Sequence, residues 1–342
     1  MVTKTLWRGG LAAFLALATL TTAWAAADRV EVKVGTVAPA GTPWSELLKT
    51  MKRDLQKAAK AAGVKLKLKT YFGGRLGGEK EMVRETREGR LQMFGGSVSA
   101  LATIVPELYI LESPFLFSSD EEIDFVLEKV RPEVEKLLAS RGFVFYQWAE
   151  NGWHGIALKG QCVSSIDVLS DKRLRSQEAS VHLDTFKALG ANPVEMAVPE
   201  VLPALEQGVV DGFSNSALLA FAASWYQGVD SFTLTNHIYQ PGVIVYSKKW
   251  FEAQPEAVQK VLLKDPRKYE KLGRTGVRAI RQGLVDNFRR EKMEVCEISD
   301  ELREKMKEAT ASVFAKYRDS ASKAGKPLVE ALIEAKKAWA AR

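Results

Sequence analysis

The sequence predicts an α/β fold of two domains with a central ligand cleft between them. Strand-like segments alternate with amphipathic helical segments over residues 30–96, and the same alternation returns over residues 142–213. This order favours largely parallel sheets with helices packed on them. The chain of 342 residues is long enough for two such units. Open sheets of this kind bind ligands in the crevice at the carboxyl ends of their strands.

The first unit begins with a strand at residues 30–34, where valines alternate with charged residues. A helix follows, with Thr42 as its expected N-cap and Gly63 as its stop. Residues 64–72 alternate again as a strand, and residues 77–96 supply a helix and a short strand.

The second unit begins with a long extended stretch over residues 142–160, interrupted at Asn151-Gly152. Short segments bounded by proline or glycine follow, and they alternate between strand and helix. We expect a strand at 171–177, a helix at 182–190, a strand at 192–198, a helix at 199–208 and a strand at 209–213.

The rest of the chain contains two extended runs around Pro241-Gly242 and then four amphipathic helices up to the C-terminus. We expect the chain to cross between its domains more than once. The predicted division is a first domain at 28–150, a second at 151–212, a return to the first at 213–250, and the second domain with spanning and C-terminal helices at 251–342.

Residues 1–27 have the pattern of a cleaved signal peptide. Lys4 and Arg8 precede an uncharged apolar run, and small residues follow it. A membrane anchor is the alternative, but the run is short of the ~20 residues that span a bilayer. We expect cleavage after Ala25 or Ala27 and a periplasmic protein that is not itself embedded in the membrane.

An oxidising compartment allows the two cysteines, Cys162 and Cys296, to form a disulfide; two buried free thiols are the alternative. Without residues 1–27 the formal net charge falls from +7 to +5. The basic residues are scattered, with no basic stripe that includes aromatic residues, so we expect no nucleic-acid partner.

The sequence offers little support for catalysis or metal binding. The three histidines, His154, His182 and His237, have no metal-ligand spacing, and there is no HExxH or CxxC motif. The glycine-rich segment at 73–80 lacks the Gly-Lys-Ser/Thr ending of a phosphate loop. We therefore expect no catalytic residues, no metal and no cofactor.

Two polar residues lie near or just after the ends of predicted strands and are expected to face the crevice. The guanidinium of Arg175 has the planar shape that binds a carboxylate through two hydrogen bonds. Asn215 adds a directional donor or acceptor that fixes the orientation of a ligand. The alternatives are a surface salt bridge for Arg175 and a helix N-cap for Asn215.

The segment from Leu169 to Asn215 resembles the solute-binding proteins of tripartite ATP-independent periplasmic (TRAP) transporters, the DctP family. The resemblance rests on "RLRSQEA" and "LGANPVEMAVPEVLPALEQGVVDG" with the asparagine that follows. It extends over nearly all of the chain after residue 27. The matching segments include "YFGGRLGGEKEMVRETREGRLQM", "VPELYILESPFLF" and "LTNHIYQPGVIVYSKKWF".

The resemblance implies a periplasmic protein with two α/β domains and a long helix that runs along both. It implies capture of an organic acid by hinge closure and delivery to the small and large membrane subunits of a permease, without ATP. We expect the hinge near residues 149–151, 209–212 and 242–245.

The resemblance also assigns site residues. The carboxylate-binding arginine of the family falls on Arg175, its later polar contact on Asn215, and its first-domain contact on Glu79. Gln177 lies in the same motif as Arg175 and is included as a ligand contact. His154 stands where a second arginine is often found, which favours a monocarboxylate or a ligand with a less charged second end.

Four aromatic residues near these motifs are further candidates for contact with an apolar or aromatic ligand tail, with domain core as the alternative. They are Trp153, Phe213, Trp225 and Tyr239.

Three other functions remain open from the sequence. They are a secreted enzyme with Glu79 or His154 as a base, a sensory ligand-binding module, and a binding protein for an ATP-driven importer.

Overall fold

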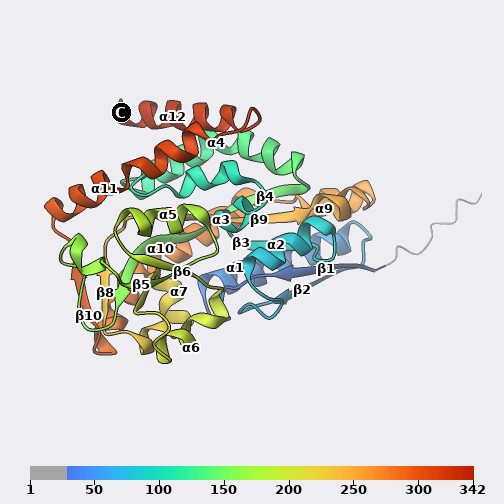
Figure 1. The fold of residues 1–342 in the computed structure, drawn as a ribbon. Helices are drawn as coiled ribbons and strands as arrows, with labels where there is room; N and C mark the ends of the chain where they lie inside the picture. Colours follow the sequence, from blue (N-terminus) through green and yellow to red (C-terminus); the bar gives the residue numbers. More distant parts are fainter. Residues whose placement is uncertain (1–28) are drawn as a thin grey trace, which may run out of the picture.

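The computed structural model describes residues 29–342, so the expected signal peptide at 1–27 lies outside the described part of the chain. Within these residues, ten strands form the sheet system (Figure 1). They are β1 (Val30–Gly35), β2 (Leu66–Tyr71), β3 (Met93–Ser97), β4 (Phe143–Leu158), β5 (Arg173–Ser176), β6 (Asn192–Glu195), β7 (Gly212–Ser216), β8 (Ser231–Leu234), β9 (Tyr239–Ser247) and β10 (Glu294–Glu297).

Helices cover the sheet on its faces (Figure 1). The α-helices are α1 (Pro43–Ala61), α2 (Glu79–Glu88), α3 (Val98–Ala102), α4 (Asp120–Ser140), α5 (Ser180–Ala188), α6 (Val201–Glu206), α7 (Ala217–Ala222), α8 (Lys248–Glu252), α9 (Glu256–Leu262), α10 (Pro266–Arg290), α11 (Asp300–Asp319) and α12 (Lys326–Ala340). The short 3-10 helices are η1 (Pro106–Glu112), η2 (Ile166–Leu169), η3 (Val198–Glu200) and η4 (Trp225–Gly228).

The strand order is β2-β1-β3-β9-β4-β7-β5-β6, with β8 paired to both β4 and β10. Strand β1 is parallel to β2 and β3, and β5 is parallel to β6 and β7. The two central strands, β9 and β4, are antiparallel to their neighbours. We call β1–β3 with their helices the first lobe and β5–β8 with theirs the second lobe. The expected parallel pairing therefore holds within each lobe, and antiparallel pairing joins the lobes.

Strand β4 belongs to both lobes. Its pairing with β9 runs up to Trp153, and its pairing with β7 starts at His154. The register with β9 shifts between Glu150 and Gly152, and Gly152 has a φ of 97°. This left-handed backbone conformation suits glycine and allows the strand to bend there.

The predicted return to the first domain at residue 213 does not match the strand pairing. Phe213 pairs with Ala157 of β4 and with Arg175 of β5, so β7 lies in the second lobe. The chain returns with β9, which begins at Tyr239, because β9 is the strand that pairs with β3. The segment 209–212, expected to be a hinge, lies within the second lobe, where Asp211 N donates to Arg173 O.

Local sequence signals explain most helix boundaries. Thr42 caps α1 through its side chain, which accepts from Ser45 N. The segment after β5 forms the expected helix, strand and helix. Its last helix ends before Gly208, whose φ of 69° stops it.

Helix α10 is the long helix that runs along both lobes. Tyr269 and Val277 pack in the core cluster beneath α1 and the first-lobe strands. Phe288, nearer its C-terminal end, packs in the second-lobe cluster with Phe232. Among residues 29–342, no helix combines the length and the apolar character needed to cross a membrane.

The two cysteines form a disulfide, Cys162–Cys296, which joins the segment after β4 to β10. Glu294 lies beside the two sulfur atoms. Sulfur atoms bonded to each other do not supply the thiolate ligands that metals take, so this group is structural.

Candidate functional site

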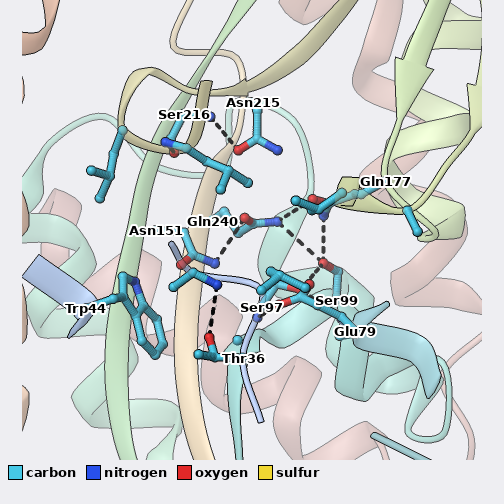
Figure 2. A pocket seen from close by; sticks show the side chains of 18 of the residues that line it. Thr36, Trp44, Glu79, Ser97, Ser99, Asn151, Gln177, Asn215, Ser216 and Gln240 are labelled. Atoms are coloured by element: carbon cyan, nitrogen blue, oxygen red, sulfur yellow. Dashed lines mark hydrogen bonds between the residues drawn. The ribbon is translucent and has the colours of Figure 1, made fainter. Parts of the chain in front are cut away.

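A cavity lies between the two lobes at the carboxyl ends of β1, β3, β5, β6 and β7. Polar side chains line one part of it, and Trp44 with several aliphatic side chains lines another (Figure 2). The lining residues are Thr36, Val37, Ala38, Pro39, Thr42, Trp44, Glu79, Lys80, Gly96, Ser97, Ser99, Ala100, Asn151, Arg175, Gln177, Glu178, Ala179, Ala197, Val198, Asn215, Ser216, Leu218, Leu219, Ala222 and Gln240.

Arg175 is held rigidly in the second-lobe wall. It is only 1% exposed, its Nε and Nη2 donate to Met196 O at 3.0 and 2.8 Å, and its guanidinium lies over the ring of Trp225 at 5.0 Å. Within residues 29–342, its buried Nη1 finds no hydrogen-bond acceptor and its guanidinium makes no salt bridge. One edge of a fixed cation is therefore available to an anion in the cavity.

Burial lowers the pKa of Arg175 to about 10, and the nearby Glu79 opposes that change. The guanidinium remains a cation at neutral pH. A buried cation without an ion-pair partner is costly, so a carboxylate placed against it gains a strong, directional interaction.

Asn215 lies at the end of β7 and is 2% exposed. Its Oδ1 accepts from Ser216 N at 2.7 Å, which orients the amide (Figure 2). The alternative role as a helix N-cap belongs to the next residue, because Ser216 Oγ accepts from Leu219 N. Asn215 lines the cavity in the same wall as Arg175.

Glu79 begins α2 in the first-lobe wall. Its Oε1 accepts from Ser97 N at 2.9 Å and its Oε2 accepts from Ser97 Oγ at 2.5 Å. A side chain at Gly96 would overlap this carboxylate, so glycine is needed beside it. Burial raises the pKa of Glu79, and the two bonds from Ser97 oppose that rise.

Gln177 joins the lobes through a hydrogen-bond network (Figure 2). Its Nε2 donates to Ser99 Oγ at 2.7 Å, and its Oε1 accepts from Gln240 Nε2 at 2.8 Å. Gln240 Oε1 accepts from Asn151 Nδ2 at 3.0 Å, and Gln240 Nε2 also donates to Glu112 Oε2 at 3.1 Å. The network connects the first lobe, the two central strands and the second lobe beside the cavity.

The four aromatic candidates do not line the cavity. Phe213 and Trp225 pack edge to face in the second-lobe core, and Tyr239 packs against Phe117 in the first-lobe core. Trp153 donates from Nε1 to Asp120 Oδ1 on α4, away from the cavity. Core packing accounts for the positions of all four aromatic side chains. The ring of Trp225 also lies against the guanidinium of Arg175.

His154 is also absent from the cavity lining. It is fully buried, its Nδ1 lies 3.3 Å from Ser214 Oγ, and its ring lies near those of His182 and His237. Burial lowers its pKa well below the ordinary range for histidine, and the neighbouring histidines add to that effect. His154 is therefore neutral and supplies no anion contact in this arrangement.

Several cavity residues escaped the sequence analysis. Thr36 follows directly after β1 and Ser97 is the last residue of β3, so their positions at strand ends were a usable signal. Trp44, Asn151 and Gln240 have no local pattern that reveals them. The pairing of β4 with β9 brings Asn151 to the cavity. Trp44 is held beside β4 because its Nε1 donates a hydrogen bond to Glu150 O at 2.9 Å.

The chain matches a family model described as bacterial extracellular solute-binding protein, family 7 (DctP), over residues 34–320. A solute-binding protein of Verminephrobacter eiseniae is 31% identical over 219 residues, which cover 64% of this chain and 65% of that relative. The 2,3-diketo-L-gulonate-binding periplasmic protein of Escherichia coli is 25% identical over 231 residues, 67% of this chain and 70% of that protein. The chain thus spans just under two thirds of the first of these relatives.

Two solved structures resemble the fold over nearly their whole length. The sugar acid binding protein of Advenella mimigardefordensis, in complex with galactonate, has a TM-score of 0.84 and 25% identity and covers 90% of this chain and 99% of its own. A TRAP periplasmic solute-binding protein of Polaromonas sp., bound to D-erythronate, has a TM-score of 0.82 and 25% identity. The match covers 89% of this chain and 98% of that protein. The two-domain fold predicted from the sequence is confirmed.

Proposed function

The chain belongs to family 7 of the bacterial extracellular solute-binding proteins, and from this premise we propose that it captures an organic acid between its lobes for a TRAP transporter. The buried guanidinium of Arg175, which lines the cavity and whose Nη1 has no partner among the described residues, carries the proposal. The carboxylate of the acid binds this edge, Asn215 fixes its orientation, and Gln177 and Glu79 contact the remaining polar groups.

Binding rather than catalysis is the proposed activity. Two structural relatives hold acids of this kind, galactonate and D-erythronate, in the same fold. In this chain the charged and amide groups of the cavity act as hydrogen-bonding walls, and Arg175 is anchored by Met196 O and Trp225 rather than left free to move with a reacting group.

Closure is proposed to depend on contacts that join the lobes beside the ligand. Gln177 of the second lobe bonds Ser99 of the first, so this bond forms only when the lobes meet. A ligand shifts the protein toward the closed state by as much as it binds that state more tightly. The hinge is proposed to lie in the two crossing strands, near Asn151 in β4 and near Gly242 in β9.

The proposed location is the periplasm, after removal of residues 1–27. The proposed partners are the small and large membrane subunits of a TRAP permease, which receive the acid from the closed protein. The name of the E. coli relative as a periplasmic binding protein supports this location.

The function is tested with a thermal-shift screen of organic acids, followed by calorimetry on the strongest acid. Arg175→Ala is expected to abolish binding while the circular dichroism spectrum stays unchanged. Arg173→Ala is the matched control, because Arg173 lies two residues earlier on β5 and pairs with Asp211 outside the cavity. Micromolar binding retained by Arg175→Ala would overturn the proposal.

A further inference from the structure

The charges around the cavity are distributed unevenly. Arg175 is the buried cation of the second-lobe wall, and Glu79 faces the same cavity from the first lobe. Lys80 also lines the cavity, but its side chain is 56% exposed and its Nζ lies 3.5 Å from Glu195 Oε1. Its charge is therefore screened by water and already paired.

Arg175 and Glu79 do not neutralise each other directly. Neither makes a salt bridge to the other within the described residues, although each is close enough to affect the other's titration. A ligand lying between them meets a cation at one end and a carboxylate at the other.

The carboxylate of Glu79 is fixed as a hydrogen-bond acceptor. Both of its oxygens accept from Ser97, once from the backbone N–H and once from the hydroxyl. The Ser97 hydroxyl oxygen in turn accepts from Ala100 N at 3.2 Å, so its own proton is directed to Glu79. A ligand group that donates a hydrogen bond therefore matches these oxygens.

Apart from the exposed and paired Lys80, the lining described for residues 29–342 holds no cation besides Arg175 that could bind another ligand carboxylate. His154 is buried behind the wall and neutral. The other carboxylate of the lining is Glu178, which adds to the negative charge, and Thr36 and Asn151 are uncharged. Trp44 and Leu218 add apolar surface to the cavity lining.

We infer that the cavity accepts a monocarboxylate whose second end carries a hydroxyl or ammonium donor, and that Glu79 discriminates against the corresponding dicarboxylate. This inference rests on the proposed function, because it assigns the ligand's first carboxylate to Arg175. A second carboxylate would lie beside Glu79 with a like charge, and that repulsion disfavours the dicarboxylate.

The test is calorimetry on the purified protein at pH 7.5 with matched probes. D-gluconate and D-glucarate differ only in a terminal hydroxyl or carboxylate, and 4-hydroxybutyrate and succinate differ in the same way. We expect each diacid to bind at least tenfold more weakly than its hydroxy acid. A further probe, 4-aminobutyrate, shows whether an ammonium or a hydroxyl is the preferred donor.

The variant Glu79→Gln is expected to reduce the tenfold difference to less than threefold, because the like charge is removed. Glu81→Gln is the control, since Glu81 is an exposed residue of the same helix and carries the same charge. It should leave the difference unchanged. Thermal unfolding of both variants shows whether they fold.

Equal or tighter binding of the diacids by the unsubstituted protein would overturn the inference and leave acid capture intact. If folded Glu79→Gln kept the full tenfold preference for the hydroxy acids, Glu79 would not be the group that discriminates against the diacids. Absence of binding by all five probes also counts against the inference. Whether acids bind at all is decided separately by the screen and by Arg175→Ala.

Discussion

His182 Nε2 lies 2.7 Å from Glu112 Oε2, and both side chains are buried. The contact joins α5 of the second lobe to η1, the helical turn that follows the first-lobe strands. Glu112 also accepts from Ser99 N at 2.7 Å. One carboxylate thus contacts groups of both lobes, and through Gln240 it belongs to the network that includes Gln177.

We expect Glu112→Ala to lower the free energy of unfolding by about 3–5 kcal/mol, because its buried donors lose their acceptor. Urea unfolding followed by circular dichroism measures the change. Glu304→Ala, which removes an exposed partner of Lys307, should change stability by less than about 1 kcal/mol. A loss below 1 kcal/mol for Glu112→Ala would show that the lobes do not depend on this carboxylate.

Arg175→Lys should weaken acid binding by roughly 10- to 100-fold, the equivalent of one or two charged hydrogen bonds. The ammonium of lysine keeps the charge but cannot bond Met196 O and a ligand carboxylate with one planar group. Calorimetry with the strongest acid of the screen measures the loss. Arg173→Lys should keep the original affinity, and a similar loss in that control would point to a general effect on β5.

Replacing Cys162 and Cys296 together by serine should lower the free energy of unfolding by about 2–5 kcal/mol. The disulfide closes a separation of 134 residues and lies away from the cavity. Acid affinity should therefore stay within about twofold of the original value. Urea unfolding of the unsubstituted protein with and without a reducing agent measures the stability contribution of the disulfide independently. A large loss of affinity would mean that the bond also sets the lobe arrangement.

The buried histidines predict acid sensitivity. Burial lowers the pKa of His237 to about 3, and the unfolded chain titrates this group near its ordinary value of 6.5. Between these values the unfolded state binds more protons than the folded state, so stability falls as the pH falls. His237→Gln should reduce the loss of unfolding free energy between pH 7 and pH 5 by about 2 kcal/mol.

This prediction is checked by urea unfolding of both proteins at the two pH values. Replacing an exposed group is not an adequate control, because only a group with different folded and unfolded pKa values contributes to the slope. His154→Gln is the better comparison, since burial also holds the pKa of His154 well below its ordinary range. Identical pH dependence in all three proteins would contradict the prediction.

The sequence predicts much of the fold because strand and helix periodicity are local properties. The segment from Arg173 to Asn215 forms the predicted elements. Its two predicted ligand contacts, Arg175 and Asn215, both line the cavity. Their direct role in ligand binding stays a prediction. Proline and glycine mark these boundaries so clearly that the chain needs no tertiary information to place them.

The aromatic candidates and the domain boundary show the limit of local signals. Phe213 and Arg175 are paired neighbours on β7 and β5, yet Phe213 is in the core and Arg175 lines the cavity. Which face of a strand is buried depends on what packs against it. Gln240 reaches the cavity only because β9 pairs with β4, and a sequence pattern does not contain that long-range pairing.

Because strand β4 belongs to both lobes, it limits where the chain can be divided into fragments. Its early residues complete the first lobe beside β9, and its late residues complete the second lobe beside β7 and β8. Cutting the chain near Asn151 would separate β9 from β3 and from the early residues of β4, whereas the late residues of β4 would stay with β7 and β8. The residues before Asn151 therefore cannot complete the first lobe alone, because its sheet would end in an unpaired edge where β9 belongs.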